Sequence, residues 1–409
     1  MVDVIVNHVS ATSRPFLDWL SNGERSAYDG MFLTFAGAFP AGATEEQLVR
    51  LYRPRPGLPF TPYQLADGTK RLLWTTFTPQ QVDVDVRHPI TAEYLIRVLD
   101  RLAAARVRRV RLDAVGYAVK TPGLTSFMTP ETFAFIDEMT GWCHQRGLEV
   151  LVEVHSYYRF QVQIARQVDQ VYDFALPPLI LHALTAADVA PLLAWMDIRP
   201  RNAVTVLDTH DGIGVIDVGA DPSDRSRPGL LTPEQIDRLV ATISDNSGRT
   251  SRRATGASTR DLYQVNCTFY DALGADDARY LLARALQLWA PGLPQIYYVG
   301  LLAGSNDLEL LARSRVDRDV NRHHYTPEEI DAALRRPVVQ QLCSLIRFRN
   351  THPAFDGEFR IRGGAGQLTL SWTAGDEVAT LAADLTMAAA TVQWTENGQT
   401  QEAALNQLP

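Results

Sequence analysis

The chain has few cysteines and no long uncharged apolar run. Its three cysteines, Cys143, Cys267 and Cys343, are widely separated and show neither a CxxC pair nor zinc-ligand spacing. This pattern excludes a disulfide scaffold and favours reduced thiols in a cytoplasmic protein. Because no stretch of about 18 uncharged apolar residues is present, the sequence predicts no membrane-spanning helix.

An excess of positive charge is also missing. The 409 residues contain 39 Lys and Arg against 47 Asp and Glu, which gives a formal net charge of −8. Net acidity argues against a nucleic-acid binder or a protein that coats a membrane surface. The 46% apolar and 21% charged composition is that of a soluble globular protein. An anionic substrate would therefore need a local cluster of arginines.

Apolar runs alternate with amphipathic segments along most of the chain. This alternation of strands and helices indicates an α/β fold with a parallel sheet. Six strands would fit an open doubly wound sheet, whereas a closed barrel needs eight. The predicted strands are residues 2–6, 107–112, 148–152, 170–174, 203–207 and 295–299. The predicted helices are residues 92–105, 129–146, 158–168, 178–196, 276–290 and 327–349.

Two long stretches interrupt this alternation, and the tail differs from both. Residues 9–88 are rich in Pro, Gly and aromatics and are expected to form an inserted subdomain, with a capped helix after Thr44. Residues 212–274 form a second expected insertion. Residues 352–409 show short alternating runs between turns, which predicts a small antiparallel β-domain. The catalytic barrel would then comprise residues 1–8, 89–211 and 275–351.

Polar residues recur where the predicted strands end. They are His8, Asp113, Glu153, Asp173 and Asp208. One such residue could simply cap the helix that follows it. Several together are typical of a barrel whose active site lies at the carboxyl ends of its strands. The recurrence therefore favours a closed barrel over an open sheet.

Asp113 and Glu153 end strands that are consecutive in this part of the barrel. Neighbouring strands lie about 4.8 Å apart, so the two carboxylates would approach the ~5–5.5 Å separation of a retaining glycosidase pair. Arg111 lies two residues before Asp113 on the same strand face and would keep Asp113 ionised. Asp211 adds a third carboxylate that could raise the pKa of Glu153 and bind sugar hydroxyls.

These residues belong to a recognisable set of motifs. VDVIVNH, RVRLDAV, LVEVH and VLDTHD resemble, in order, the four motifs of the α-amylase superfamily. YRPRPGLPF, FTPQQVD, DLYQVN and RDVNRH resemble the sucrose phosphorylase branch of glycoside hydrolase family 13. The resemblance implies an α-amylase-type (β/α)8 TIM barrel. It also implies that sucrose and phosphate give α-glucose 1-phosphate and fructose, with retention through two inversions.

The same resemblance assigns roles to individual residues. Asp113 would be the nucleophile, Glu153 the acid/base and Asp211 the stabiliser of the transition state. Arg55 and Tyr263 would meet phosphate, and Asp261 and Gln264 the fructosyl acceptor. The residues expected to surround the glucosyl group and its neighbouring acceptor are His8, Phe77, Gln81, Arg111, Tyr117, His155, His210 and Arg318. No metal and no cofactor are expected, and a homodimer is suggested.

Other interpretations remain open at this level. The two arginines of YRPRP could belong to an ordinary solvated surface turn. The substrate could be that of a related phosphorylase acting on sucrose 6′-phosphate or glucosylglycerate. A barrel without activity could serve only to bind carbohydrate, although the charged set around Asp113 argues against this. His323-His324 has no matching carboxylate spacing for a metal.

The position of the first predicted strand, at residues 2–6, leads to a further expectation about the barrel. By the resemblance, residues 2–6 are the third strand of the barrel, so the chain would lack the first two strand–helix units. Arg318 would then lose the acidic partner that it has in the family. The lost burial leads us to expect that these 409 residues alone fold poorly or are inactive.

Overall fold

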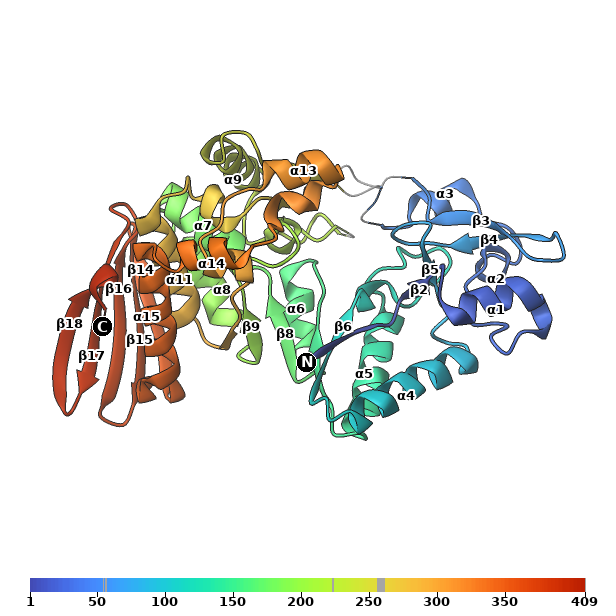
Figure 1. Cartoon of the computed structure of the whole chain (residues 1–409), viewed down its shortest axis with the longest axis horizontal. Coiled ribbons are helices and arrows are strands. Elements are labelled where there is room, and N and C mark those ends of the chain that lie inside the picture. The colour runs from blue at the N-terminus through green and yellow to red at the C-terminus, as the bar shows by residue number, and fades with distance from the viewer. Residues whose placement is uncertain (54, 56, 223, 256–261, 409) are drawn as a thin grey trace. The chain divides into compact units, whose positions relative to one another are not determined.

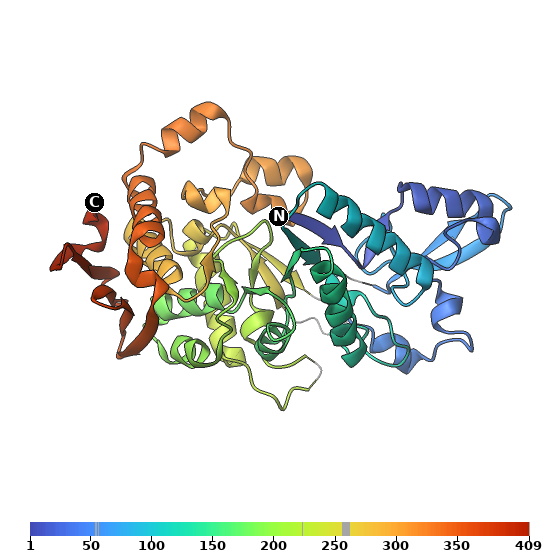
Figure 2. The same cartoon turned by 90° about the horizontal axis from the view of Figure 1, so that it is seen from below.

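The computed structural model describes residues 1–53, 55, 57–222, 224–255 and 262–408 (Figures 1 and 2). Two compact units divide the chain. The first holds the described residues of 1–154 and 163–172 together with Thr255, and the second holds those of 155–162, 173–254 and 262–408. None of the helices in the described part of the chain has the length and apolar character that crossing a bilayer requires.

Parallel strands form the centre of the first unit. They lie in the order β1, β6, β7, β8 and comprise Val2–Ile5, Arg109–Asp113, Glu149–Val152 and Gln170–Asp173. The register pairs Ile5 with Asp113 and Leu112 with Val152. This parallel pairing confirms the predicted α/β class and brings the carboxyl ends of the strands to one edge.

Two long helices cross between these strands, and Figure 1 labels them α4 (Pro89–Ala104) and α5 (Pro130–His144). Each begins with a proline in its first turn, where the missing N–H costs no hydrogen bond. The Thr129 hydroxyl caps α5 by accepting a hydrogen bond from the Thr132 N–H. Leu95 and Leu99 of α4 are buried, as their helical spacing predicted.

The insertion at residues 9–88 has a small core of its own. Leu33, Phe39, Leu51 and Trp74 are buried together there. Its helices are α1 (Arg14–Asn22), η1 (Gly23–Arg25), α2 (Phe35–Ala38) and α3 (Glu45–Val49). Its strand pairs are β2 (His8–Ser10) with β5 (Gln81–Asp83), and β3 (Phe60–Gln64) with β4 (Lys70–Trp74). The predicted capping box at Thr44 is present.

The second unit continues the parallel pattern with β9 (Ala203–Thr205) and β13 (Leu293–Pro294). A second sheet has the order β10, β12, β11 and comprises Ile213–Gly214, Leu262–Asn266 and Arg252–Thr255. Its longer helices are α6 (Tyr158–Ile164), α7 (Leu176–Ala186), α8 (Ala190–Ile198), α9 (Pro233–Asn246), α11 (Asp277–Trp289), α13 (Leu308–Ser314), α14 (Pro327–Ala333) and α15 (Pro337–Thr351). The short ones are α10 (Phe269–Ala272), α12 (Tyr298–Leu301), η3 (Ile216–Val218), η4 (Asp317–Asn321), η5 (Pro353–Asp356) and η6 (Leu405–Gln407). The remaining short helix, η2 (Val115–Tyr117), belongs to the first unit.

Two helices that were predicted as continuous are each broken in two. The segment 178–196 is divided at Ala187, which adopts a left-handed conformation with φ of 53°. The segment 327–349 is divided before Pro337, because a residue that precedes proline disfavours the helical conformation. Arg336 is accordingly extended, with φ of −70° and ψ of 133°.

The strand predicted at 295–299 is wrong. Pairing with β9 covers Leu293 and Pro294 and continues only to Gln295, whose N–H donates to the Thr205 carbonyl at 2.9 Å. The chain then turns into α12. A Cβ at Gly300 would lie 1.9 Å from Oδ2 of Asp208. Glycine at this position therefore allows the backbone of α12 to approach Asp208 closely.

The tail forms the expected antiparallel sheet. Its strands lie in sequence order, β14 to β18, at Glu358–Gly364, Gln367–Ala374, Glu377–Asp384, Ala389–Glu396 and Gln399–Ala404. Figure 1 shows the sheet beside α11 and α15. The Trp372 indole N–H donates to the Trp289 carbonyl at 2.7 Å. The domain boundaries expected at 212, 275 and 352 stay predictions.

Candidate active site

Asp113 and Glu153 stand at the same edge of the parallel sheet in the first unit. Asp113 is the last residue of β6, and Glu153 directly follows β7. The Glu153 N–H donates to the Leu112 carbonyl at 3.2 Å, so the pairing of the two strands extends to the acid itself. The parallel register therefore brings both carboxyl groups to the carboxyl end of neighbouring strands, as predicted.

Arg111 contacts both of these acids. Its Nη1 lies 2.8 Å from Oδ1 of Asp113 and 3.1 Å from Oδ2 of Asp3, and its Nη2 lies 3.9 Å from Oε1 of Glu153. Burial opposes the charge of this guanidinium, but Glu153, Asp113 and Asp3 outweigh burial and raise the pKa of Arg111. The predicted pairing with Asp113 is present, whereas the contact with Asp3 was not foreseen.

Four residues that were expected near the glucosyl group or its acceptor cluster in the same unit. The ring of His8 meets Phe77 edge to face at 5.4 Å, and Phe77 meets Tyr117 in the same manner at 5.2 Å. Nε2 of Gln81 lies 2.9 Å from Nε2 of His8. Burial is the main cause that lowers the pKa of His8, so its ring is neutral near pH 7.

A buried lysine, which the sequence did not reveal, supports this cluster. The Lys120 ammonium lies 2.7 Å from Asp83 and also donates to the Asn7 side chain and the Tyr117 carbonyl. Burial lowers the pKa of Lys120 more than Asp83 raises it. Lys120 thereby connects the residue before His8 to β5 and η2. A single lysine offers no sequence pattern by which this role could have been found.

Asp211 is the centre of a second cluster, which lies in the second unit. Its Oδ1 lies 2.6 Å from Nη1 of Arg318 and 3.6 Å from Nη2 of Arg322, and its Oδ2 lies 3.9 Å from Nε2 of His210. Burial by itself raises the pKa of Asp211, but Arg318, together with His210, His155 and Arg322, outweighs burial and lowers it. Arg318 thus pairs with Asp211, whereas the expected loss of the acid that partners it in the family stays a prediction.

Residues next to Arg318 fix the backbone around Asp211. The Asn321 amide donates to the carbonyls of Thr209, at 3.3 Å, and Asp211, at 3.0 Å. The Arg322 Nε donates to the His210 carbonyl at 2.7 Å. Sequence reasoning had assigned no role to Asn321 or Arg322, although both stand in the motif RDVNRH.

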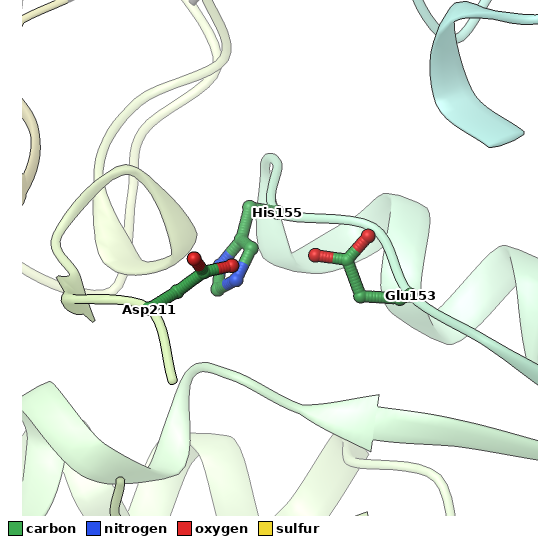
Figure 3. Close-up of side chains that lie close together, drawn as sticks. All are labelled: Glu153, His155 and Asp211. Carbon is green, nitrogen blue, oxygen red and sulfur yellow. The ribbon is translucent and has the colours of Figure 1, made fainter. Parts of the chain in front are cut away.

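His155 lies beside Asp211 in the second unit, and Figure 3 shows both side chains together with that of Glu153. The imidazole stacks on Phe174 at 3.7 Å, and its Nδ1 lies 2.9 Å from Oδ2 of the buried Asp217. The ring of Tyr263 is 5.9 Å away. Asp217 and Phe174 therefore fix the orientation of the ring.

Gln264 is fully buried on β12, opposite Gly214. Among the residues that the structure describes, neither its amide nitrogen nor its amide oxygen has a hydrogen-bond partner. An unsatisfied buried amide costs free energy that a polar ligand could offset. Asp261, which was expected beside it, lies outside the described residues.

The two arginines of the YRPRP motif differ in what their side chains contact. Arg53 is buried and donates to the backbone carbonyls of Gly57, Leu58 and Phe77. It therefore holds the loop together, and the alternative of a turn with two solvated arginines is wrong for Arg53. Arg55 is partly exposed.

The predicted residues thus fall into two groups, one in each unit. The group of the first unit comprises Asp113, Glu153, Arg111, His8, Phe77, Gln81 and Tyr117, with Arg55 on its inserted loop. The group of the second unit comprises Asp211, His155, His210, Tyr263, Gln264 and Arg318. Each group contains carboxylates next to arginines, an arrangement that can serve acid-base and electrostatic catalysis.

Comparison with known proteins gives strong matches. The chain is 55% identical to "Sucrose phosphorylase" of Agrobacterium vitis over 395 residues, which are 96% of this chain and 80% of that protein. It is 57% identical to the protein of the same name from Bifidobacterium adolescentis over 361 residues, 88% of this chain and 71% of that one. The crystal structure of sucrose 6F-phosphate phosphorylase from Thermoanaerobacter thermosaccharolyticum matches with a TM-score of 0.91 at 34% identity, over 98% of this chain and 83% of that chain. Among models of protein families, none matches the chain.

Proposed function

The chain belongs to the sucrose phosphorylase family within glycoside hydrolase family 13, and from this premise we propose that it transfers glucose from sucrose to phosphate. Its fold is the α-amylase-type barrel with a C-terminal β-domain. The observation that carries the proposal is the contact of the Arg111 guanidinium with both Asp113 and Glu153 at neighbouring strand ends. A retaining reaction needs two carboxyl groups at such a position.

In the first half-reaction Asp113 attacks the anomeric carbon of the glucosyl group. The bond to the fructosyl oxygen breaks, and Glu153 gives its proton to that oxygen. Fructose leaves, and a β-glucosyl ester on Asp113 remains. Arg111 supports this step, because a buried guanidinium keeps the nucleophile ionised before the attack.

In the second half-reaction a phosphate oxygen attacks the same carbon from the face that fructose left. Glu153 takes a proton from the phosphate, and the bond to Asp113 breaks, so α-glucose 1-phosphate forms with net retention. Asp211 is proposed to stabilise the positive charge that develops on the sugar in both steps. Its lowered pKa supports this role, because it ensures that the carboxylate is charged.

Binding roles are proposed for the remaining residues. His8, Phe77, Tyr117, His155, His210 and Arg318 would hold the glucosyl group, with Gln81 toward the acceptor. Arg55 and Tyr263 would meet the phosphate, and Asp261 and Gln264 would meet fructose. The partly exposed side chain of Arg55 suits a phosphate ligand, whereas Arg53 is buried and its Nη1 and Nη2 donate to backbone carbonyls.

The test is to incubate the purified protein with sucrose, with and without phosphate, and to measure glucose 1-phosphate and fructose. We expect glucose 1-phosphate only when phosphate is present. Asp113→Asn and Glu153→Gln should lower its formation by about 100-fold or more. Glu149→Gln is the matched control, because Glu149 is an exposed glutamate at the start of β7, the strand that Glu153 follows. Release of free glucose at a rate independent of phosphate would instead identify a hydrolase.

Related phosphorylases are the alternative, and the same assay separates them. Sucrose 6′-phosphate, glucosylglycerol and glucosylglycerate are offered in parallel arms with phosphate. The proposal requires the highest kcat/KM on sucrose. A preference of tenfold or more for one of the other donors would assign the chain to that activity within the same family.

Arg55→Ala tests the phosphate role by itself. We expect phosphorolysis to fall far more than glucosyl transfer to a neutral acceptor such as glycerol, because only phosphate needs a cation. Arg50→Ala is the control, since Arg50 is an exposed arginine just before the same loop and pairs with Glu46. An equal loss of both activities would count against the assignment.

A further inference from the structure

A short segment, residues 317–323, carries the side chains that surround Asp211. Arg318, Asn321 and Arg322 reach the loop 209–211 from it, through the contacts described above. We call it the arginine segment. Because it approaches Asp211 from a part of the chain more than 100 residues away, something must fix it in the folded protein.

The last residue of the arginine segment, His323, bridges two carboxylates. Its Nδ1 lies 2.6 Å from Oδ2 of Asp307, and its Nε2 lies 3.3 Å from Oε1 of Glu329. Asp307 caps α13 by accepting the Leu310 N–H, and Glu329 belongs to the capping box of α14. His323 therefore links the start of both helices to the segment.

Both acids are hydrogen-bond acceptors when ionised, and a neutral imidazole has only one N–H to donate. Only the protonated ring can donate to both at once. Burial lowers the pKa of His323, but the hydrogen bonds and charges of Asp307 and Glu329 outweigh burial and raise it. The capping hydrogen bonds from the backbone N–H groups of Leu310 and Thr326 are the main causes that lower the pKa of Asp307 and of Glu329, and His323 lowers both further.

Two tyrosines also contact His323. The Tyr325 ring meets the imidazole edge to face at 4.5 Å, and burial raises the pKa of Tyr325 to about 12. The Tyr298 hydroxyl of α12 donates to the His323 carbonyl at 2.7 Å. The Asp307 N–H also donates to the Val320 carbonyl at 2.7 Å. Asp307 therefore holds the backbone of the segment as well as the ring at its end.

We propose that His323 is a positioning residue, whose protonated ring bridges Asp307 and Glu329 and thereby fixes the arginine segment with Arg318 and Arg322 on Asp211. This inference rests on the proposed function only in so far as Asp211 acts in catalysis. Loss of the proton removes one of the two hydrogen bonds and loosens the segment. Activity therefore falls as pH rises through the pKa of His323.

Two substitutions test the charge without removing the helix caps. Asp307→Asn and Glu329→Gln keep a side-chain oxygen that can accept the capping hydrogen bond, but they take away the negative charge. Each should lower the pKa of His323 by about one unit. The ratio of variant to parent kcat for phosphorolysis should then be close to its low-pH value below both pKa values and fall by about threefold or more as pH rises through the window between them. A merely structural role would lower this ratio equally at every pH.

The pKa of the ring is followed separately, by NMR titration of the histidine ring protons. His324→Asn is the matched control, because His324 is the exposed neighbour, and His323→Asn assigns the signal. The proposal predicts a pKa above 6.5 that falls in both charge variants. An unshifted ring pKa, or a shifted one with a flat kcat ratio, would overturn it. If the parent shows no phosphorolysis of sucrose, the proposed function fails, while the titration still decides whether the bridge exists.

Discussion

Nη1 of Arg318 lies 2.6 Å from Oδ1 of Asp211, closer than any other cation recorded around that carboxylate. Burial raises the pKa of Asp211, and among the charged neighbours that lower it Arg318 has the largest effect. The effect of Arg318 on Asp211 is therefore electrostatic. Arg318 keeps a nearly buried carboxylate in its charged form, in which it can stabilise a cationic transition state.

Arg318→Met should therefore reduce phosphorolysis by about 100-fold and change its pH dependence. Without Arg318, burial is less well opposed and the pKa of Asp211 rises. A smaller fraction of Asp211 is then ionised at acidic pH, so the acidic limb of the kcat profile shifts to higher pH. Arg313→Met, at an exposed arginine on α13, should change neither quantity. A lower kcat with an unshifted acidic limb would contradict the electrostatic role.

Arg111→Met should destabilise the protein by about 3–5 kcal/mol, because it leaves the acids around a buried cation without their partner. The Arg111 side chain is only 8% exposed and contacts three carboxylates. Arg109, on the same strand, pairs with the half-exposed Glu149, so Arg109→Met should cost about 1 kcal/mol or less. Urea denaturation of both variants provides the comparison. Equal losses would show that burial of the pair is not the deciding factor.

Gly214→Ala should impair activity by disturbing the support of His155. A Cβ at Gly214 would lie 2.1 Å from Oδ2 of Asp217 and 3.0 Å from Nδ1 of His155, so the hydrogen bond between them could not persist unchanged. We expect kcat/KM for sucrose to fall by about tenfold or more. Gly141→Ala, in α5, meets nothing within 4 Å and should raise stability by about 1 kcal/mol. If the Gly214→Ala enzyme keeps full activity, the hydrogen bond from Asp217 to His155 is not needed for catalysis.

The thiols should differ sharply in reactivity. Burial raises the pKa of Cys143 and of Cys267 to about 12, so neither forms appreciable thiolate at pH 8. Cys343 is only partly buried. Titration of the native protein with a chromogenic disulfide at pH 8 should therefore detect one reactive thiol, and the denatured protein should give all three. Rapid reaction of Cys143 or Cys267 would show that their surroundings open readily.

Several features of the fold followed from local sequence chemistry. Proline after a capping threonine set the start of α5, and β-branched runs that end in acids predicted β6 and β7. The two predicted helices that proved broken both contain an internal proline. Pro337 disfavours the helical conformation at Arg336, and in a continuous helix the ring of Pro191 would clash with the carbonyl of Ala187, so both breaks have a local signal that the longer periodic pattern obscured.

The sequence by itself determined the family, the alternation of strands and helices, and the acids at the strand ends, because motifs and periodicity are properties of neighbouring residues. Only the tertiary structure decided which charges meet. It paired Arg318 with Asp211, buried Lys120 against Asp83, and used Arg53 to hold its own loop. Such pairings join residues that are distant in the chain, and their energies depend on burial, which no local pattern specifies.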